Sequence, residues 1–158
     1  MKLLFICTHN RCRSILGEAI TKSIGNNNLI AASAGSSPQG EVHPMTIKYL
    51  QEKGIDTDEL SSQSWHDFEG FEPDVVLTMC DNAAKETCPV WFKDSLQVNW
   101  ALEDPSKNSD NERLQKDAFY KTMDIIERRI KAVLELQTHD LSKAQLKSEF
   151  VAIAEQIH

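Results

Sequence analysis

Four short segments of the chain have the apolar character of strands. They are residues 2–6 (KLLFI), 29–34 (LIAASA), 74–79 (DVVLTM) and 95–100 (SLQVNW). The first and third are apolar runs typical of buried strands, whereas the fourth alternates apolar and polar positions. We therefore predict four strands.

Apolar residues at helical spacing predict helices between and after these strands. The helices cover residues 14–25, about 44–53, 109–137 and the terminal stretch that follows Ser142. Ser109 and Glu112 have the spacing of a capping box, in which two side chains satisfy backbone N–H groups at a helix start. Ser142 and Gln145 repeat this spacing. The terminal helix carries an apolar stripe and should therefore dock on the domain or on a second copy of the chain. The stripe consists of Leu146, Phe150, Ile153 and Ile157.

Strands that alternate with helices predict an α/β fold with a parallel sheet covered on both faces. We interpret residues 1–158 as a single domain, with 141–158 as an extra C-terminal helix. In such sheets, ligands bind beyond the carboxyl ends of the strands, where the strand order reverses. Cys7 follows the first strand and Cys80 follows the third, so we expect both thiols at this edge of the sheet.

The composition narrows the classes of function. The chain has 158 residues, of which 41% are hydrophobic and 26% charged, and its net charge is −7. This is the balance of an ordinary acidic globular domain. The negative charge disfavours binding to nucleic acid or to an anionic membrane. Arg11 and Arg13 concentrate positive charge in one loop, which suits a small anion.

Export and membrane insertion are not expected. The N-terminal apolar run is too short for a signal peptide, and no stretch approaches the ~20 apolar residues of a membrane helix. We therefore expect a cytoplasmic monomer whose four cysteines stay reduced. A zinc site is not expected either, because no CxxC pair occurs and the histidines are scattered.

Residues 7–14 (CTHNRCRS) join the first predicted strand to the first helix. Backbone N–H groups of such a loop, together with the helix N-terminus, can cradle an anion. Arg13 can hold two oxygens of a tetrahedral oxyanion, and the same positive field stabilises a thiolate at Cys7. Ser14 can donate a hydrogen bond to that thiolate or cap the helix. The pattern indicates an oxyanion held above a sulfur nucleophile. The alternative is an inert buried thiol beside a solvated arginine.

This loop resembles the phosphate-binding loop of the low-molecular-weight protein tyrosine phosphatase superfamily. The resemblance continues through SAGSSPQGEVHP, GID, DVVLTMCDNAAKETCP and WALEDP, and it covers about residues 1–137. Within the superfamily the chain looks most like the thiol-dependent arsenate reductases. The resemblance implies a flavodoxin-like three-layer sandwich with a four-stranded parallel sheet.

The resemblance also implies that the loop binds the substrate. The residues concerned are Thr8, His9, Asn10, Arg11, Cys12 and Arg13. We interpret Cys12 as a bystander whose side chain points into packing. His9 stands where many relatives carry glycine, and we interpret it as a spacer, since histidine tolerates a positive φ. The alternative is that its imidazole modulates the anion site.

Two chemistries of this superfamily share a first step, the attack of Cys7 on a bound tetrahedral oxyanion. A phosphatase then hydrolyses the cysteinyl phosphate, whereas arsenate reduction needs further thiols that end as a disulfide. Cys80 fits the resolving thiol, and Cys88 fits a shuttle that passes the disulfide outward. The alternative is that both are small core residues.

Asp104 resembles the general acid of this superfamily, which protonates a leaving oxygen. The alternative is a turn residue before Pro105. Superfamily phosphatases usually follow this Asp-Pro with tyrosines that line an aromatic pocket, whereas Ser106 and Lys107 follow here. We therefore predict an arsenate reductase. A phosphatase is the second candidate, and a non-catalytic oxyanion-binding or redox-sensing protein is the third.

The resemblance extends to a cation and to electron donors. Some relatives bind potassium beside the loop through residues that match Asn10, Glu18 and Ser33. The fourth, acidic position falls at Trp65, which departs from that pattern. We expect no tightly bound cofactor. Thioredoxin is the expected electron donor, with glutaredoxin and glutathione as the alternative.

A conformational change is expected between Cys80 and Cys88. If the intervening DNAAKET is helical, a rise of ~1.5 Å per residue separates the two Cα atoms by ~12 Å. A disulfide needs roughly 4.4–6.8 Å, so the segment must unwind when the two thiols react. Asp81, Asn82 and Pro89 suit this change, because the first two favour turns and proline disfavours helix at the preceding residue.

Overall fold

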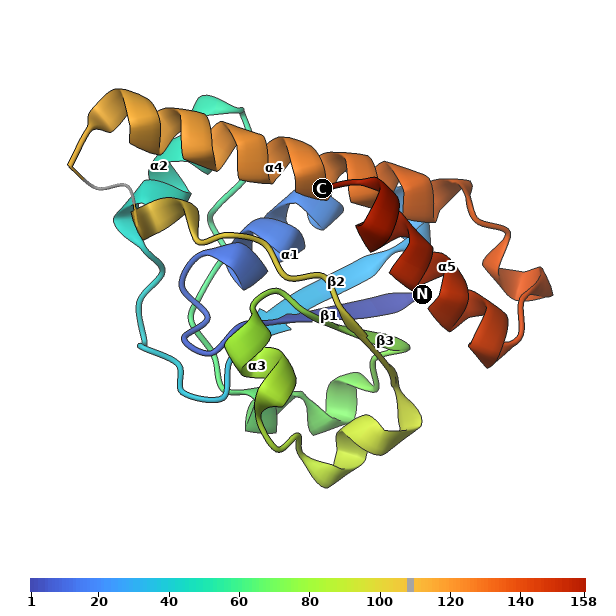
Figure 1. Cartoon of the computed structure of the whole chain (residues 1–158). Coiled ribbons are helices and arrows are strands. Elements are labelled where there is room, and N and C mark those ends of the chain that lie inside the picture. The colour runs from blue at the N-terminus through green and yellow to red at the C-terminus, as the bar shows by residue number, and fades with distance from the viewer. Residues whose placement is uncertain (108–109) are drawn as a thin grey trace.

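The computed structural model describes residues 1–107 and 110–158, and a four-stranded parallel sheet lies at its centre (Figure 1). The strands are β1 (Lys2–Ile6), β2 (Ile30–Ala34), β3 (Val75–Thr78) and β4 (Leu96–Asn99), in the order β2-β1-β3-β4. All four predicted strands are confirmed. The last three are one or two residues shorter than the sequence pattern indicated.

The order of the strands places a switch point between β1 and β3. Ile6 of β1 lies opposite Ala34 of β2 on one side and opposite Thr78 of β3 on the other. The chain therefore adds β2 on one side of β1 and then crosses to begin β3 on the other. Cys7 directly follows β1, and Cys80 lies two residues beyond β3. Both thiols are thus at the carboxyl edge of the sheet, where ligands bind in folds of this kind.

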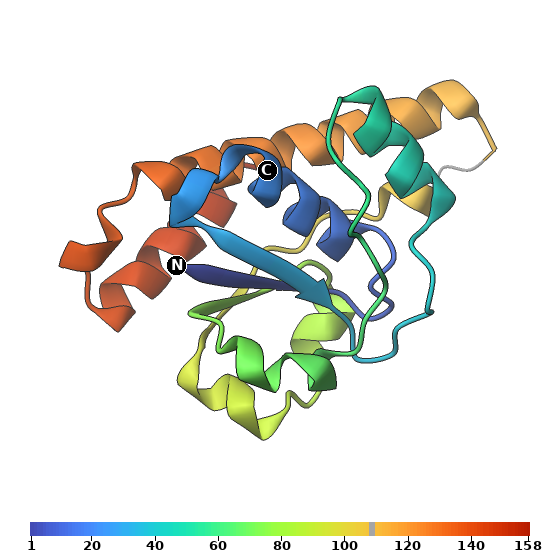
Figure 2. The same cartoon turned by 180° about the vertical axis from the view of Figure 1, so that it is seen from behind.

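Helices cover both faces of the sheet and complete the three-layer α/β sandwich. One face carries α1 (Arg13–Ile24), α4 (Glu112–Glu135) and α5 (Lys143–Gln156). The opposite face carries α3 (Asp81–Lys85) and two 3-10 segments, Trp65–Phe71 and Val90–Asp94, as the rear view in Figure 2 shows. The remaining helix, α2 (Pro44–Glu52), packs against α1 and α4 at one end of its layer. None of the described helices combines the length and the apolar character needed to cross a bilayer.

The start of α4 differs from the sequence prediction. This helix begins at Glu112 and not at 109, and it ends at Glu135 and not at 137. Its N-cap is Asn111, whose Oδ1 accepts hydrogen bonds from the N–H groups of Arg113 (3.0 Å) and Leu114 (3.2 Å). Ser109 of the predicted capping box lies outside the described residues.

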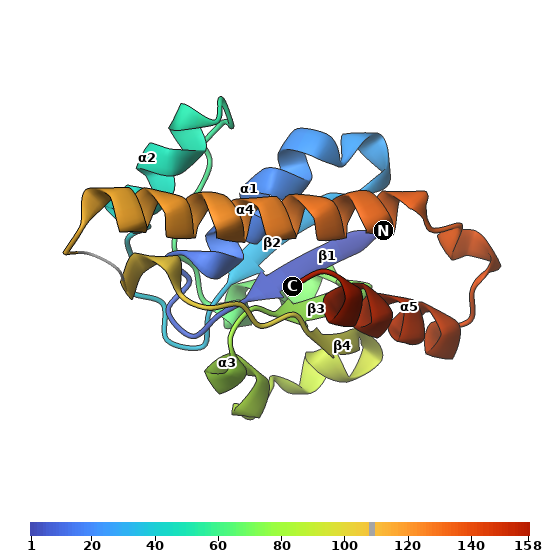
Figure 3. The ribbon, with the colours of Figure 1, turned by 45° about the horizontal axis from the view of Figure 1, so that its top comes forward.

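The terminal helix α5 docks on the domain, as its apolar stripe predicted. It begins with the expected capping box of Ser142 and Gln145. It lies beside α4 and over β4 (Figure 3). Phe150 and Ile153 are buried in the core, and Leu146 and Ile157 pack against it.

The segment between Cys80 and Cys88 is helical over only part of its length. The condition that residues 81–87 are helical is met over Asp81–Lys85 and not beyond, because Glu86 is extended. Pro89 disfavours helix at the residue before it. The side chain of Glu86 also bonds to the loop that follows β1, which holds the chain away from the axis of α3.

Candidate active site

The loop between β1 and α1 brings a hydroxyl against the thiol of Cys7. Ser14 Oγ lies 2.8 Å from Cys7 Sγ, and both groups are buried. Asn10 Nδ2 donates a hydrogen bond to the same Ser14 Oγ at 2.8 Å. Because this oxygen already accepts from Asn10, the proton of Ser14 is free to point at the sulfur. A hydrogen bond donated to sulfur favours the thiolate, which is the nucleophilic form.

Asn10, and not His9, carries the unusual backbone conformation of this loop. Its φ is 46°, in the left-handed region that asparagine tolerates better than most residues. His9, where a positive φ would be tolerated, does not adopt one. The side chain of Asn10 also accepts the N–H of Gln63 through Oδ1 at 2.7 Å, so it ties the loop to a distant segment. Asn10 accordingly braces the loop from within.

A cavity of about 130 Å³ lies above Cys7. Of the predicted site residues, it collects Cys7, Thr8, His9, Arg11, Cys12, Arg13, Cys80 and Asp104. Three further residues, His43, Asn82 and Ser106, complete its lining. Asn10 and Ser14 lie behind the wall, and Cys88 is not part of the lining. Among the described residues, no Phe, Tyr or Trp side chain lines this cavity, so it suits a small anion.

Arg13 and Asp104 face each other across one side of the cavity. Arg13 is the first residue of α1, and its Nη1 donates a hydrogen bond to the carbonyl of Leu102 at 2.9 Å. Its Nη2 lies 4.0 Å from Asp104 Oδ2. Residues 100–105, which we call the strap, therefore hold the guanidinium from the far side. The Leu102 contact could not be predicted from the sequence, because a main-chain carbonyl has no signature in the side-chain pattern.

Asp104 is held as a carboxylate by its surroundings. Burial by itself would raise the pKa of Asp104. The hydroxyl and the N–H of Ser106 both donate to Oδ1, at 2.6 and 2.9 Å, and Arg13 and Lys107 add positive charge. Together these groups outweigh the burial and hold the pKa of Asp104 below its ordinary value.

The four cysteines are free; Cys7, Cys12 and Cys80 are buried, and Cys88 is not. Cys12 is buried, and burial raises the pKa of its thiol to about 12, so it stays protonated near neutral pH. Cys80 is buried in the wall of the cavity. Cys88 is half-buried, and its Sγ donates to Oε1 of Gln97 on β4 at 3.4 Å. Burial and the nearby charge of Glu86 raise the pKa of Cys88.

Glu86 is a site residue that the sequence pattern did not reveal. Thr8 Oγ1 donates a hydrogen bond to Glu86 Oε1 at 2.8 Å, and the same Oγ1 lies 3.9 Å from Cys80 Sγ. Thr8 and Glu86 are 78 positions apart in the chain. One glutamate among 24 acidic residues has no local feature that marks it.

The candidate potassium ligands are engaged with protein groups. Both carboxylate oxygens of the buried Glu18 are used, one by the hydroxyl of Ser33 at 2.6 Å and the other by the ammonium of Lys22 at 2.7 Å. The amide oxygen of Asn10 accepts from Gln63. Across residues 1–107 and 110–158, there is no group of three or more His, Cys, Asp or Glu side chains arranged to hold a metal ion. Lys22 thus supplies the positive charge that a cation would bring to Glu18.

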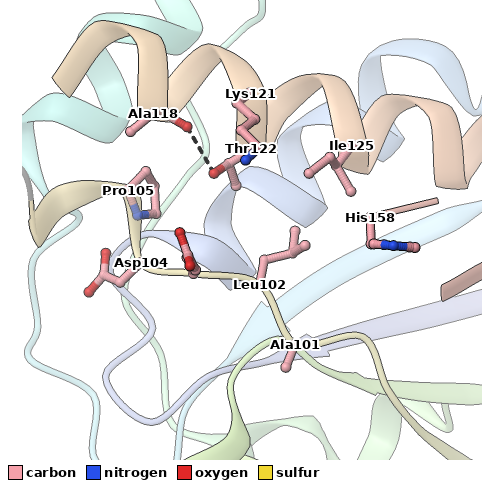
Figure 4. A pocket seen from close by; sticks show the side chains of 10 residues that line it. Ala101, Leu102, Asp104, Pro105, Ala118, Lys121, Thr122, Ile125 and His158 are labelled. Atoms are coloured by element: carbon pink, nitrogen blue, oxygen red, sulfur yellow. Dashed lines mark hydrogen bonds between the residues drawn. The ribbon is translucent and has the colours of Figure 1, made fainter. Parts of the chain in front are cut away.

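A second cavity, of about 300 Å³, lies behind the strap and against α4 (Figure 4). Leu102, Pro105 and Ile125 give it apolar walls, and Lys121 and His158 lie at its edge. Asp104 lines this cavity as well as the one above Cys7. The strap is therefore a thin wall between the two cavities.

Comparisons with known proteins find similarity over most of the chain, including the loop that holds Cys7. Residues 2–149 match the low molecular weight phosphotyrosine protein phosphatase family. The chain is 32% identical over 108 residues to a glutaredoxin arsenate reductase of Synechocystis sp., covering 68% of this chain and 81% of that protein. It is 32% identical over 133 residues to an arsenate reductase of Halalkalibacterium halodurans, covering 84% of this chain and 94% of that protein. A solved structure of an arsenate reductase in the phosphate binding state superposes with a TM-score of 0.70 at 27% identity, covering 84% of this chain and 95% of that chain.

Proposed function

Because this chain belongs to the low molecular weight phosphotyrosine protein phosphatase family, we propose that it binds a tetrahedral oxyanion above Cys7 and reduces arsenate to arsenite. The observation that carries this proposal is a second thiol, Cys80, in the wall of the cavity that contains Cys7. Hydrolysis of a phosphate ester needs only the first thiol. Reduction of arsenate needs two electrons, which a pair of thiols supplies by becoming a disulfide.

The first step is the attack of the Cys7 thiolate on arsenate, with loss of one arsenate oxygen as water. Ser14 stabilises the thiolate, and the guanidinium of Arg13 binds two of the remaining oxygens. Asp104 gives its proton to the leaving oxygen. A bound dianion raises the pKa of a neighbouring carboxyl group, so substrate binding opposes the groups that keep Asp104 ionised and favours loading of this proton.

The next steps transfer the disulfide outward. The Cys80 thiolate attacks Sγ of Cys7, the sulfur–arsenic bond breaks, and its electron pair stays on arsenic as arsenite leaves. Cys88 then attacks Cys80, which restores Cys7 as a thiolate and leaves a Cys80–Cys88 disulfide. Because Cys88 bonds to Gln97 and does not line the cavity, the segment that carries it must move for this step.

The electron donor that suits this end product is a dithiol protein of the thioredoxin class. The Cys80–Cys88 disulfide closes within one short segment, and we expect the movement of this segment to expose it. Val90, two residues beyond Cys88, is 74% exposed. An apolar side chain beside the disulfide gives a reducing protein a surface to dock on. Glutaredoxin with glutathione is the other candidate donor. The relative from Synechocystis is named a glutaredoxin arsenate reductase.

Hydrolysis of phosphate monoesters is the second candidate function. Cys7, Arg13 and Asp104 are the groups that this reaction needs, and all three line one cavity. The small volume and the lack of a Phe, Tyr or Trp side chain in the described lining favour an inorganic anion over an aryl ester. Slow hydrolysis of an aryl phosphate is therefore expected as a side reaction that does not depend on Cys80.

Potassium does not fit the residues of this chain, because Ser33 bonds to one carboxylate oxygen of Glu18 and the ammonium of Lys22 bonds to the other. We assign no step of the reaction to a cation. The proposed setting is the cytoplasm, where a reduced thiol pool keeps the three reacting cysteines ready. A monomer is the proposed state, since Cys7, Arg13, Cys80 and Asp104 line one cavity of a single chain.

The test is an arsenate turnover assay in which thioredoxin and glutaredoxin systems are compared side by side and arsenite is measured directly. We expect turnover with the thioredoxin system, no arsenite from Cys7→Ser, and no arsenite from Cys80→Ser. The Cys80→Ser protein should still hydrolyse an aryl phosphate. Absence of arsenite with both donors, from protein that hydrolyses the ester, would instead favour the phosphatase.

A further inference from the structure

A carboxylate lies against the loop that holds Cys7, although no step described so far uses it. Glu86 belongs to the extended residues that follow α3, and it is half-buried. Its Oε1 accepts the hydroxyl proton of Thr8 at 2.8 Å. This bond connects the segment that carries the second and third thiols to the residue next to the first.

The hydrogen bond to Glu86 fixes the direction of a second contact. Thr8 Oγ1 also lies 3.9 Å from Cys80 Sγ, within the range of a long contact to sulfur. A hydroxyl has one proton, and that of Thr8 points at Glu86. Across the second contact, the thiol of Cys80 must therefore be the donor. The three groups form a directed chain in which Cys80 S–H points to Thr8 O–H, which points to the carboxylate of Glu86.

We propose that Glu86, acting through the hydroxyl of Thr8, takes the proton of Cys80 when this thiol attacks Cys7. The inference rests on the proposed arsenate reduction. As the thiol loses its proton to Thr8, Thr8 passes its own proton to Glu86. The resulting thiolate forms a bond to Cys7 Sγ, the bond from that sulfur to arsenic breaks, and the electron pair leaves on arsenic as arsenite. Cys80 Sγ also accepts a hydrogen bond from the backbone N–H of Ala83 at 3.4 Å, which stabilises negative charge on the sulfur during this step.

Other charged groups lie near Cys80, Thr8 and Glu86. Their positions make Glu86 the best-placed acceptor for the proton of Cys80. Arg13 and Asp104 line the cavity with Cys80, but Asp104 accepts from Ser106 on the far side. Asp81 is paired with Asn99 through Oδ1 at 3.2 Å. Glu103 lines a neighbouring cavity together with Cys80, but Thr8 bonds to Glu86. The remaining titratable or charged groups near the cavity are Cys7, His9, Arg11, Cys12, His43, Lys85 and Lys107. Among the described residues, Thr8 is the only side chain in contact with Cys80 Sγ that is also hydrogen-bonded to a carboxylate.

The variant that isolates proton transfer is Glu86→Gln. The amide oxygen of glutamine still accepts the bond from Thr8, so the geometry is kept, but the group cannot take a proton. In a Cys88→Ser background, which stops the reaction at the Cys7–Cys80 disulfide, we expect single-turnover release of arsenite at pH 7 to slow by about 10²-fold. The deficit should shrink as the pH rises, because hydroxide can then take the proton in place of Glu86. Glu86→Asp should recover part of the rate.

Thr8→Val tests the middle of the relay, since valine has the shape of threonine without the hydroxyl. It should slow arsenite release as Glu86→Gln does, and the double variant should be no slower than the slower single one, because both remove the same path. Asp81→Asn is the matched control. It removes one negative charge from the same segment without touching Thr8, and its rate should stay near that of the Cys88→Ser parent.

Arsenate binding separates a chemical role from a structural one. Protection of Cys7 from iodoacetamide reports the affinity, which Glu86→Gln should leave nearly unchanged. An affinity that falls in proportion to the rate, or a rate deficit that is equal at every pH, would overturn the relay. So would a Glu86→Gln protein as fast as its parent. A parent protein that releases no arsenite at all overturns the proposed function, and the relay with it.

Discussion

The indole N–H of Trp100 donates a hydrogen bond to the main-chain carbonyl of Phe150 at 2.9 Å, across 50 positions of the chain. The two rings are also stacked, with centroids 5.5 Å apart. Arg129 of α4 donates to the carbonyls of Trp100 and Ile157, each at 2.8 Å. Burial and the nearby Arg128 lower the pKa of Arg129 to about 10, which leaves it charged at neutral pH. Helix α5 is thereby fastened to the first residue of the strap that holds Arg13.

Phe150→Ala should therefore destabilise the protein and loosen the strap. Removing a fully buried phenyl ring costs about 3–5 kcal/mol of unfolding free energy. Denaturant unfolding measures this loss, and amide exchange over residues 146–157 should become faster. Val151→Ala, on the same helix but 37% exposed, is the control and should change little. Unchanged exchange in Phe150→Ala would contradict docking of α5 through this side chain.

Arg13→Lys should lower arsenate reduction by about 10²-fold or more, in the range seen when one preorganised donor is removed from an anion site. A lysine cannot reach the carbonyl of Leu102 and two substrate oxygens at once, because its ammonium is a single point charge. Steady-state kinetics with arsenate give the loss, and protection of Cys7 from alkylation gives the affinity. An affinity for arsenate close to that of the unaltered protein would show that Arg13 does not bind two substrate oxygens.

Gly35→Ala should disturb the loop from behind. A Cβ at this position would lie 2.6 Å from the carbonyl oxygen of Thr8 and 2.7 Å from that of Cys7, which main-chain atoms cannot accommodate without moving. Overpacking of this kind costs roughly 1–3 kcal/mol, and a displaced nucleophile costs on the order of 10²-fold in rate. Gly70→Ala is the control, because open space surrounds that position. Equal activity of the two variants would contradict this prediction, because the loop after β1 would then accommodate the added Cβ without displacing Cys7.

Cys12 should stay unreactive and make the fold sensitive to high pH. Its folded pKa of about 12 lies above the ordinary thiol value of 9.0, so the fold favours the protonated form. The unfolded chain therefore loses this proton first as the pH rises, and stability falls between those two values. Alkylation near neutral pH should leave Cys12 unmodified. Cys12→Ala should flatten the alkaline loss of stability, and an unchanged profile would contradict burial as its cause.

Oxidation should loosen the segment between Cys80 and Cys88. In the reduced structure Cys80 faces Thr8, whereas Cys88 faces Gln97, so a disulfide between them requires new backbone conformations. Hydrogen exchange on both redox forms should show faster exchange over residues 81–88 after arsenate turnover. Equal protection in a protein that has formed this disulfide would contradict the switch. Failure of the disulfide to form would remove the shuttle role of Cys88 and favour the glutathione route.

The sequence determined the features that depend on local pattern. Apolar runs and their spacing predicted the four strands, and the capping box predicted the start of α5, because both follow from nearest neighbours along the chain. The order strand, loop, arginine, serine and helix placed Cys7, Arg13 and Ser14 in one loop. The positive φ fell on Asn10 and not on its neighbour, since the bonds that stabilise it reach Gln63.

Tertiary structure alone decided which distant groups meet in the site. The pairs Thr8–Glu86 and Arg13–Leu102 join residues 78 and 89 positions apart, and no local periodicity encodes such contacts. The spacing of Glu18 and Lys22 is visible in the sequence as an ordinary helical pair. The pair matters because folding buries Glu18 beside Ser33. A buried carboxylate has lost its contacts with water and needs a partner that compensates its charge. Side-chain direction and burial, which a linear pattern does not specify, are the physical reason for this division.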